Sequence, residues 1–322
     1  MTVSILVSTF NRAALLQQTL DRLRQQQYEP GDELIVVDNA STDGTAEVIE
    51  AAVRTFPVPV RHLHESKAGK SWALNQAIAA ARGEILALTD DDVLVADDWL
   101  PTLRKIFADP AIALVGGRVD PRWERPAPEW LRVDEGEHYG GMSAPLALLH
   151  YGDAQELRDR SAVGANMGVR RRVVEQVGGF ATHLGRRAGT LLCGEDHDLC
   201  ARAIAAGFRC EYRPELRVRH WVPANRLTLR YFVRWFFWSG ITEVVLERTV
   251  PAAYAGSPAR RNLPREFISG LLRGFADFVR RRQADAALHL MDAACALGRM
   301  LQHGRDWWNG DARDEQQPAL AA

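Results

Sequence analysis

Short apolar segments alternate with helix-like segments through the first hundred residues, and this alternation constrains the fold more than any other feature. The apolar segments are Val3–Thr9, Glu33–Asn39, Val60–Glu65 and Glu84–Asp90. Apolar residues recur at helical spacing between them, in Ala13–Gln27, Thr45–Phe56 and Ser71–Ala81. Strands that alternate with helices pair in parallel, because each helix carries the chain back across a face of the sheet. The sequence therefore predicts an α/β fold, with a mixed, mostly parallel, Rossmann-like sheet flanked by helices.

The pattern changes after this first region. The stretch from Pro121 to Trp130 is rich in proline, tryptophan and charge, which predicts a long functional loop. A helix is expected from Gly194 to Ala206, where Gly207 can end it, followed by strands at Phe208–Tyr212 and Leu216–Trp221.

From Arg226 onward only helical patterns remain, in Leu227–Leu246 and Glu266–Leu301. We therefore expect an α/β domain over 1–225 whose halves are 1–100 and 101–225. A helical region is expected over 226–309, and a disordered tail over 310–322.

Composition limits the possible partners and the cellular compartment. The 322 residues are 47% hydrophobic and can bury a large core, while the net charge of -1 provides no general attraction for nucleic acid. The four cysteines lack the paired spacing of a zinc site or the density of a disulfide scaffold. The first apolar run is too short for a signal peptide. These features favour a cytoplasmic protein.

Polar side chains follow each of the four predicted strands. These are Thr9, Asp38, Glu65 with Lys67, and Asp90–Asp92. In an open α/β sheet, ligands bind beyond the carboxyl ends of the parallel strands, where loops and helix N-termini converge. Turn-favouring Asp and Thr are common at strand ends, so the coincidence of all four carries more weight than any one of them.

The cluster Asp90-Asp91-Asp92 places three carboxylates side by side. Like charges ~4 Å apart repel by about 1 kcal/mol in water and by more when desolvated, so a cation would stabilise the cluster. Oxygen ligands suit Mg²⁺ or Mn²⁺, for which a diphosphate is a natural partner. The structural alternative is an Asp-rich loop that caps a helix near Asp97-Asp98-Trp99.

Two further features each have a functional and a structural interpretation. Glu195 and Asp196 could provide a general base, or could simply favour the first turn of a helix. His220 could complete a metal site, or could be an ordinary structural histidine. The segment Ala68-Gly69-Lys70-Ser71 lacks the earlier glycine of a phosphate-binding P-loop, and we reject that interpretation.

Taken in order, several spaced blocks over about residues 2–240 resemble the family 2 glycosyltransferases of the GT-A fold. The blocks are Val7–Arg12, Val36–Thr45, Lys67–Asn75, Thr89–Asp92, Gly164–Met167, Gly194–Asp196 and His220.

The resemblance implies roles for individual residues. Thr9 and Asp38 would hold the nucleotide base, and Asp90 would lie near the ribose. Asp92 and His220 would bind the metal, although the Asp-Asp-Asp sequence leaves open whether Asp91 or Asp92 is the main ligand. Further contacts to the nucleotide are expected from Asn11, Arg12, Lys67, Asn75 and Asp91. The donor sugar and the acceptor would be contacted by Gly164, Ala165, Asn166, Glu195 and Trp123.

The resemblance also implies a reaction. Asp196 would take the proton from an acceptor hydroxyl, and the sugar of a nucleotide-diphosphate donor would be transferred with inversion, with Mn²⁺ or Mg²⁺ as cofactor. The acceptor would be a glycan or a lipid-linked molecule. A nucleotidyltransferase would leave Glu195 and Asp196 without a task, and a non-catalytic sugar-nucleotide scaffold would not need Asp196.

The C-terminal helical region mixes aromatic and basic residues. Leu229–Leu246 is interrupted by charges before it reaches the ~20 residues of a membrane span. Arg273 and Arg280–Arg282 accompany the apolar residues of Phe267–Arg282, a pattern typical of helices on anionic lipid. We expect peripheral contact with the inner face of the cytoplasmic membrane through residues 229–282. Packing of these helices on the catalytic domain is the alternative.

Overall fold

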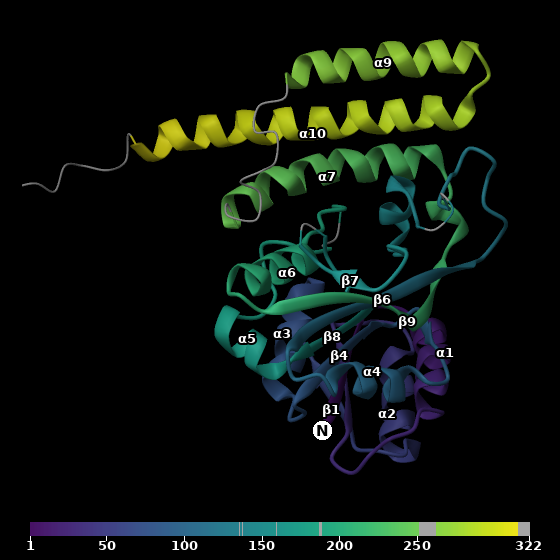
Figure 1. Ribbon diagram of the computed structural model, residues 1–322, viewed down its shortest axis with the longest axis vertical. Coiled ribbons are helices and arrows are strands. Elements are labelled where there is room, and N and C mark those ends of the chain that lie inside the picture. The colour runs from purple at the N-terminus through teal and green to yellow at the C-terminus, as the bar shows by residue number, and fades with distance from the viewer. Residues whose placement is uncertain (135, 137, 159, 187–188, 251–261, 315–322) are drawn as a thin grey trace, which may run out of the picture. The chain divides into compact units, whose positions relative to one another are not determined.

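The computed structural model describes residues 1–134, 136, 138–158, 160–186, 189–250 and 262–314 (Figure 1). The chain divides into two compact units, residues 1–227 and 228–322. The first unit contains one sheet with helices, and the second is helical.

The first unit is built on a nine-stranded sheet in the order β3-β2-β1-β4-β8-β6-β9-β5, with β7 also paired to β9. The strands are β1 (Val3–Thr9), β2 (Glu33–Asp38), β3 (Val60–His64), β4 (Ile85–Asp90), β5 (Val93–Val95), β6 (Ile112–Trp123), β7 (Gln155–Glu156), β8 (Asn166–Arg170) and β9 (Arg209–Val222). β1, β2, β3, β4, β6 and β9 run in one direction, and β5, β7 and β8 run in the other. The predicted mixed, mostly parallel sheet is therefore confirmed.

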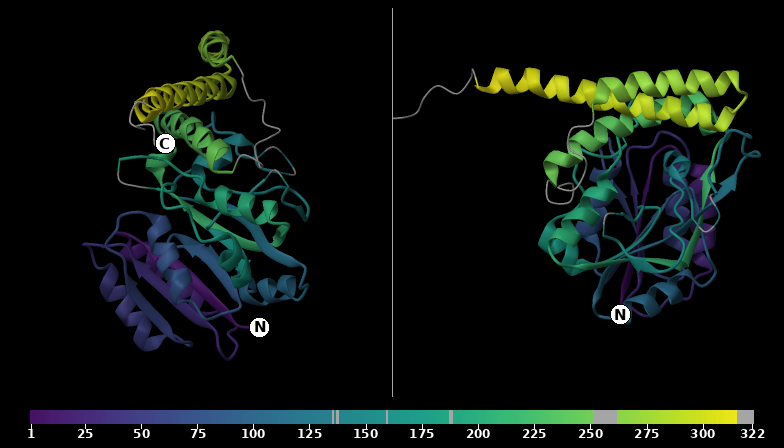
Figure 2. Two further views of the ribbon diagram at one scale, coloured as in Figure 1. Left: turned by 90° about the vertical axis from the view of Figure 1, so that its left-hand side faces the viewer. Right: turned by 45° about the horizontal axis from the view of Figure 1, so that its top comes forward.

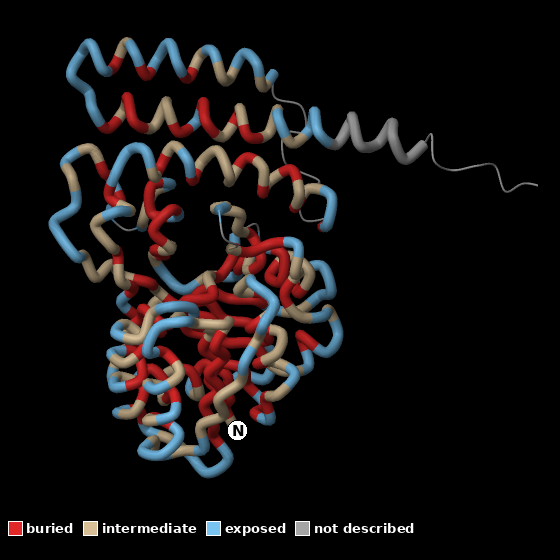
Figure 3. Tube along the Cα trace, turned by 180° about the vertical axis from the view of Figure 1, so that it is seen from behind, coloured by how far each residue is buried: buried red, intermediate tan, exposed pale blue. Residues whose placement is uncertain are grey.

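The helices of this unit connect the strands. They are α1 (Ala13–Arg24), α2 (Thr45–Thr55), α3 (Lys70–Ala80), α4 (Trp99–Phe107), α5 (Arg171–Val177) and α6 (Glu195–Ala205). The central strands read as nearly continuous apolar runs because helices cover both faces of the sheet. Ile5, Leu34 and Leu86 are fully buried, and each such side chain contributes roughly 1.5–3 kcal/mol. The buried positions gather along these strands (Figure 3).

Two expectations for the middle of the chain were wrong. The loop expected from Pro121 to Trp130 begins three residues later, at Glu124, because β6 continues to Trp123 and pairs with β9 along its whole length. The two strands expected between Phe208 and Trp221 are one strand, β9, whose register against β6 shifts after Gly117. This irregularity lets one long strand pair with β6 and, through its second half, with β5.

The second unit contains α7 (Leu229–Thr249), α9 (Leu263–Val279) and α10 (Gln283–Asp314). The long helical pattern expected over Glu266–Leu301 is thus two helices, which separate at Arg280–Arg282. α10 packs against both α7 and α9 (Figures 1 and 2). α10 extends into the expected tail as far as Asp314, and residues 315–322 lie outside the described part. Among the described residues, no helix has both the length and the apolar character needed to cross a bilayer.

Candidate active site

The strand ends that the sequence singled out meet at one edge of the sheet. Thr9 at the end of β1 pairs in register with Asp38 at the end of β2, and both are buried. Ser8 pairs with Asp90 on the other side of β1, and Asp38 pairs with His64. This edge therefore carries polar groups from four adjacent parallel strands.

The acidic cluster lies in the turn from β4 to β5. Asp90 ends β4, while Asp91 and Asp92 are 5% and 3% exposed. β9 runs antiparallel to β5 and places His220 opposite Val93. Nε2 of His220 lies 3.3 Å from Oδ1 of Asp92. The sheet thus brings together an acidic turn and a histidine that are far apart in the sequence.

The donor atoms of this cluster fit a hard divalent cation. One ligand atom each from Asp90, Asp92 and His220 lie within 4.8 Å of one another. Nδ1 of His220 is buried and has no hydrogen-bond partner among the described residues, and Oδ1 of Asp92 is buried beside Nε2 of the same ring. Unsatisfied buried polar atoms are unfavourable, and a cation bound between the carboxylate and the imidazole would give such an atom a partner. Asp90–Asp92 do not cap α4, because β5 (Val93–Val95) lies between them and that helix, whose N-cap is Asp98.

Two basic side chains border the acidic turn. Nη1 of Arg12 lies 3.1 Å from Oδ1 of Asp91 and also pairs with Asp92. Nζ of Lys70, the first residue of α3, lies 2.6 Å from Oδ1 of Asp90. Lys70 was missed as a site residue, although its place at the start of a helix after the third strand was a usable signal. Both side chains partly neutralise the acidic turn.

Electrostatics distinguish the two inner carboxyl groups. Burial and the adjacent charge of Asp92 raise the pKa of Asp91 to about 6. Burial also opposes ionisation of Asp92, but His220 and Arg12 outweigh it and hold the pKa of Asp92 well below its usual range. Asp92 therefore stays ionised at lower pH than Asp91.

The second acidic cluster begins α6. Oδ2 of Asp196 accepts a 2.8 Å hydrogen bond from the backbone N–H of Gly164, and its Oδ1 has no partner. A methyl group on Gly164 would lie 2.9 Å from that Oδ1, so the close approach requires glycine. Burial and the charge of Glu195 raise the pKa of Asp196 to about 7. A carboxyl group with such a pKa can accept and release a proton near neutral pH.

Lys70 connects the two acidic clusters. Although burial opposes its charge, the nearby carboxylates of Asp90, Asp196 and Glu195 raise the pKa of Lys70 above its usual value. The first-turn carboxylates of α6 therefore face the same lysine as the acidic turn after β4. The structure brings Asp196 to the edge of the sheet that carries the candidate cation site.

Several other predicted site residues are engaged by the protein itself. Both polar atoms of the Asn75 side chain bond the backbone of Phe180, at 2.8 Å each. Asn166 is fully buried and bonds Trp99 Nε1 at 2.9 Å and two backbone carbonyls. The carbonyl of Ala165 accepts from Thr89. These contacts fix the positions of α3 and β8 around the site.

The remaining predicted residues lie at its borders. Asn11, at φ 52, accepts a 2.7 Å bond from Thr42 N–H, and this contact joins the β1 and β2 loops. The Lys67 ammonium lies 4.3 Å from the centre of the Trp72 ring. Trp123 ends β6, two residues beyond the partner of His220, and is partly buried.

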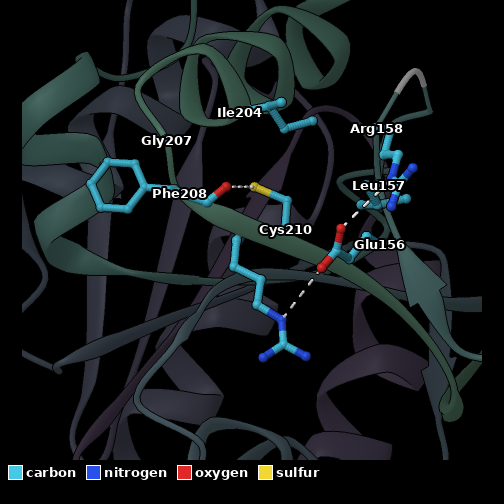
Figure 4. Close-up of a pocket in the computed structure, with 8 residues that line it drawn as sticks. Glu156, Leu157, Arg158, Ile204, Gly207, Phe208 and Cys210 are labelled. Atoms are coloured by element: carbon cyan, nitrogen blue, oxygen red, sulfur yellow. Dashed lines mark hydrogen bonds and ion pairs between the residues drawn. The ribbon is translucent and has the colours of Figure 1, made fainter.

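A surface pocket elsewhere in the first unit is separate from this site. Its lining includes Ile204, Gly207, Phe208 and Cys210, at the C-terminal end of α6 (Figure 4). Asp196 lies at the other end of that helix, about 12 Å from Ile204 at 1.5 Å per residue. The pocket therefore has no part in the chemistry of the acidic clusters.

Comparison with known proteins identifies the family. Residues 4–178 match the sequence profile described as glycosyl transferase family 2. The chain belongs to this family. The resemblance of its spaced blocks to family 2 is therefore confirmed. Sugar transfer is the general activity expected of a member of this family.

Relatives of this family 2 chain act on several glycans and lipids. The glucosyl-dolichyl phosphate glucuronosyltransferase of Haloferax volcanii is 27% identical over 79% of this chain and 80% of its own length. The O-antigen chain rhamnosyltransferase RfbN of Salmonella typhimurium is 28% identical over 68% of this chain and 66% of its own length.

A solved structure supports the fold. The mannosyltransferase PcManGT from Pyrobaculum calidifontis, in complex with GDP-Man and Mn²⁺, matches with a TM-score of 0.61 and 23% identity. The match covers 92% of this chain and 86% of that one. The predicted GT-A fold is confirmed.

Proposed function

We propose that this chain transfers a sugar, with inversion, from a nucleotide-diphosphate sugar to a hydroxyl group of a glycan or lipid-linked acceptor. The observation that supports this most directly is that one ligand atom each from Asp90, Asp92 and the buried His220 lie within 4.8 Å of one another at the end of β4. These ligand atoms suit a hard divalent cation, and a cation at this sheet edge would bind an anionic ligand such as a diphosphate. Family membership and the relatives' activities favour the same reaction class.

On this proposal, the donor lies along the ends of β1, β2 and β4. Thr9 and Asp38 contact the nucleotide base, and Asp90 lies near the ribose. Thr9 is buried at the end of β1, in register with Asp38. Arg12 and Lys70 balance the charge of the diphosphate, and Asn11, Lys67, Asn75 and Asp91 make further contacts to the nucleotide.

Asp92 and His220, with Asp90, would hold Mn²⁺ or Mg²⁺, and the bound cation supplies Lewis-acid stabilisation of the departing nucleoside diphosphate. Asp196 takes the proton from the acceptor hydroxyl as that oxygen attacks the anomeric carbon. The backbone N–H of Gly164 holds one oxygen of Asp196 and leaves the other available for the proton. Glu195 and Trp123 border the acceptor, and Gly164 to Asn166 form the floor beneath the sugar.

Nucleotide and metal binding can be tested by thermal unfolding. We expect one of UDP, GDP and dTDP to raise the unfolding midpoint by several degrees, and only when Mn²⁺ is present, because a ligand of the folded state stabilises it. The nucleotide alone and Mn²⁺ alone serve as controls. Equal midpoints in all of these conditions would contradict a metal-assisted donor site.

The proton-transfer role of Asp196 predicts a specific pH dependence. The base acts only when deprotonated, so kcat/KM should fall about tenfold per pH unit below the Asp196 pKa of about 7. The Glu195 charge helps to raise that pKa. The Glu195→Gln variant should therefore show the fall of kcat/KM at a lower pH than the parent chain. Rate profiles from about pH 5 to about pH 9 would measure the shift. If kcat/KM of Glu195→Gln fell at the same pH as that of the parent chain, another group would be responsible for the pH dependence.

The proposal includes a place in the cell. A lipid-linked acceptor would be met at the inner face of the cytoplasmic membrane, and we propose contact with anionic lipid within residues 229–282. Residues 251–261 of that range lie outside the described part of the chain.

A further inference from the structure

The helix α9 exposes its large apolar side chains. Each of these side chains is between 42% and 70% exposed. They are Ile268, Leu271, Leu272, Phe275, Phe278 and Val279. Their spacing of three and four residues places them on one face of the helix, the α9 apolar face. In a soluble domain that face normally packs against the core. Among the described residues, none buries it.

The opposite face of α9 is the one that packs on the protein. Gly270, Gly274 and Asp277 are buried there. A methyl group on Gly270 would lie 2.9 Å from the carbonyl oxygen of His289 in α10. Nε2 of His289 also lies 3.3 Å from Oδ2 of Asp277. α9 lies along α10 (Figure 2) and is attached to it by small and polar residues, which leaves its large apolar residues exposed.

α7 differs from α9, although its sequence is richer in aromatic residues. Phe232 and Trp235 are buried, and Leu229 is the single large apolar residue of α7 that is strongly exposed among those described. Gly240 of α7 would clash with the Cys295 carbonyl of α10 if it carried a side chain, so these two helices pack closely. The unpartnered apolar surface of the described helical unit therefore lies on α9.

Charge indicates the chemistry of what covers this face. Arg265 borders this face, about 60° from Ile268 at 100° per residue, and Arg280–Arg282 follow it, and all four arginines are exposed. Arg273 is also exposed but lies about 140° from Ile268, away from the apolar residues. The acidic residues of the same stretch are Glu266 and Asp277. Around the helix axis, at 100° per residue, they lie about 160° and 180° from Ile268, on the side of α10. A second copy of this helix would bring like charges together, whereas an anionic lipid surface would attract them.

We infer that the α9 apolar face inserts into the surface of a bilayer that contains anionic lipid. The aromatic and aliphatic side chains enter the boundary between headgroups and acyl chains, and the arginines contact the lipid phosphates. This inference rests on the proposed membrane contact of residues 229–282 and narrows it to one face of one helix. It does not depend on which sugar the chain transfers.

Flotation of the full chain with phosphatidylcholine vesicles, with and without phosphatidylglycerol, tests the inference. We expect co-flotation with the anionic vesicles at low salt. Phe275→Ser/Phe278→Ser should lower the bound fraction at least about tenfold, because both rings are about 70% exposed in the free protein and would lose their burial in lipid. Arg280→Gln/Arg281→Gln/Arg282→Gln should lower binding to anionic vesicles by a similar factor.

A matched control replaces an exposed apolar residue and a neighbouring arginine on α2. Val53 is 42% exposed beside exposed Arg54, and Val53→Ser/Arg54→Gln should float like the parent chain. Each variant should keep the parent's unfolding midpoint and donor-dependent stabilisation, which separates membrane binding from the proposed reaction. Co-flotation of the parent chain without any stabilisation by the nucleotide would support membrane binding by the α9 apolar face and contradict the proposed donor site. No flotation of the parent chain, equal flotation of the α9 variants, or a dimer that the Phe275→Ser/Phe278→Ser variant abolishes would overturn the inference.

Discussion

Replacing Asp196 by Asn should lower the transfer rate by roughly 10²–10⁴-fold, the usual contribution of a positioned general base. The amide is nearly the same size, and its oxygen can still accept the hydrogen bond from Gly164 N–H. It cannot take a proton from an acceptor hydroxyl at neutral pH. The change should therefore reduce kcat while donor binding persists, which steady-state kinetics and nucleotide-dependent thermal shifts would measure.

A control for this substitution is Asp21→Asn, which makes the same change at an exposed position on α1. It should transfer sugar at the parent rate. Glu195→Gln should remain active, because its expected effect is on the pH dependence set by Asp196. If Asp196→Asn turned over at the parent rate, the Asp196 carboxylate would not be the group that takes the proton.

The second large effect is expected at Asp92. Asp92→Asn should weaken Mn²⁺ binding by about 100-fold or more, because even the outer partners of metal ligands contribute about 10–100-fold. The amide keeps the shape of the turn but loses the negative charge that Arg12 and His220 stabilise. Transfer and the metal-dependent thermal shift should be lost together, which distinguishes this variant from Asp196→Asn. Calorimetric titration with Mn²⁺ would measure the change in affinity.

Two comparisons sharpen this test. Asp98→Asn alters an exposed carboxylate at the start of α4 and should leave Mn²⁺ binding intact. Asp91→Asn should have a smaller effect than Asp92→Asn, because Asp91 lies outside the group of ligand atoms formed by Asp90, Asp92 and His220. The reverse order of effects would make Asp91 the main ligand.

The first half of the fold could be predicted well because its signals are local. The apolar run that predicted Val3–Thr9 coincides with β1, and the run from Glu33 ends within one residue of β2. Strands buried on both faces need continuous apolar sequence, and this requirement is visible without a structure. Pro121 misled the prediction, because proline is unfavourable within most strands but is accommodated in β6.

The candidate site was only partly predictable. Asp90–Asp92 were visible because parallel strand ends meet at one edge whatever the rest of the chain does. The roles of Asn75 and Asn166 were harder to assign, since the partners of a buried amide come from distant segments. Lys70 was discarded with a failed P-loop motif, and its meaning depends on Asp90 and Asp196, which only the folded chain brings near it.

The sequence by itself determined the alternation of strands and helices, the acidic turn after β4 and the aromatic and basic character of the C-terminal helices. Periodicity and residue type encode these properties over a few residues. Tertiary structure alone decided that the β9–β5 pairing brings His220 to Asp92, and that α7 buries aromatic residues while α9 exposes them. Such choices depend on which distant surfaces pack together, and a local pattern is compatible with more than one packing partner.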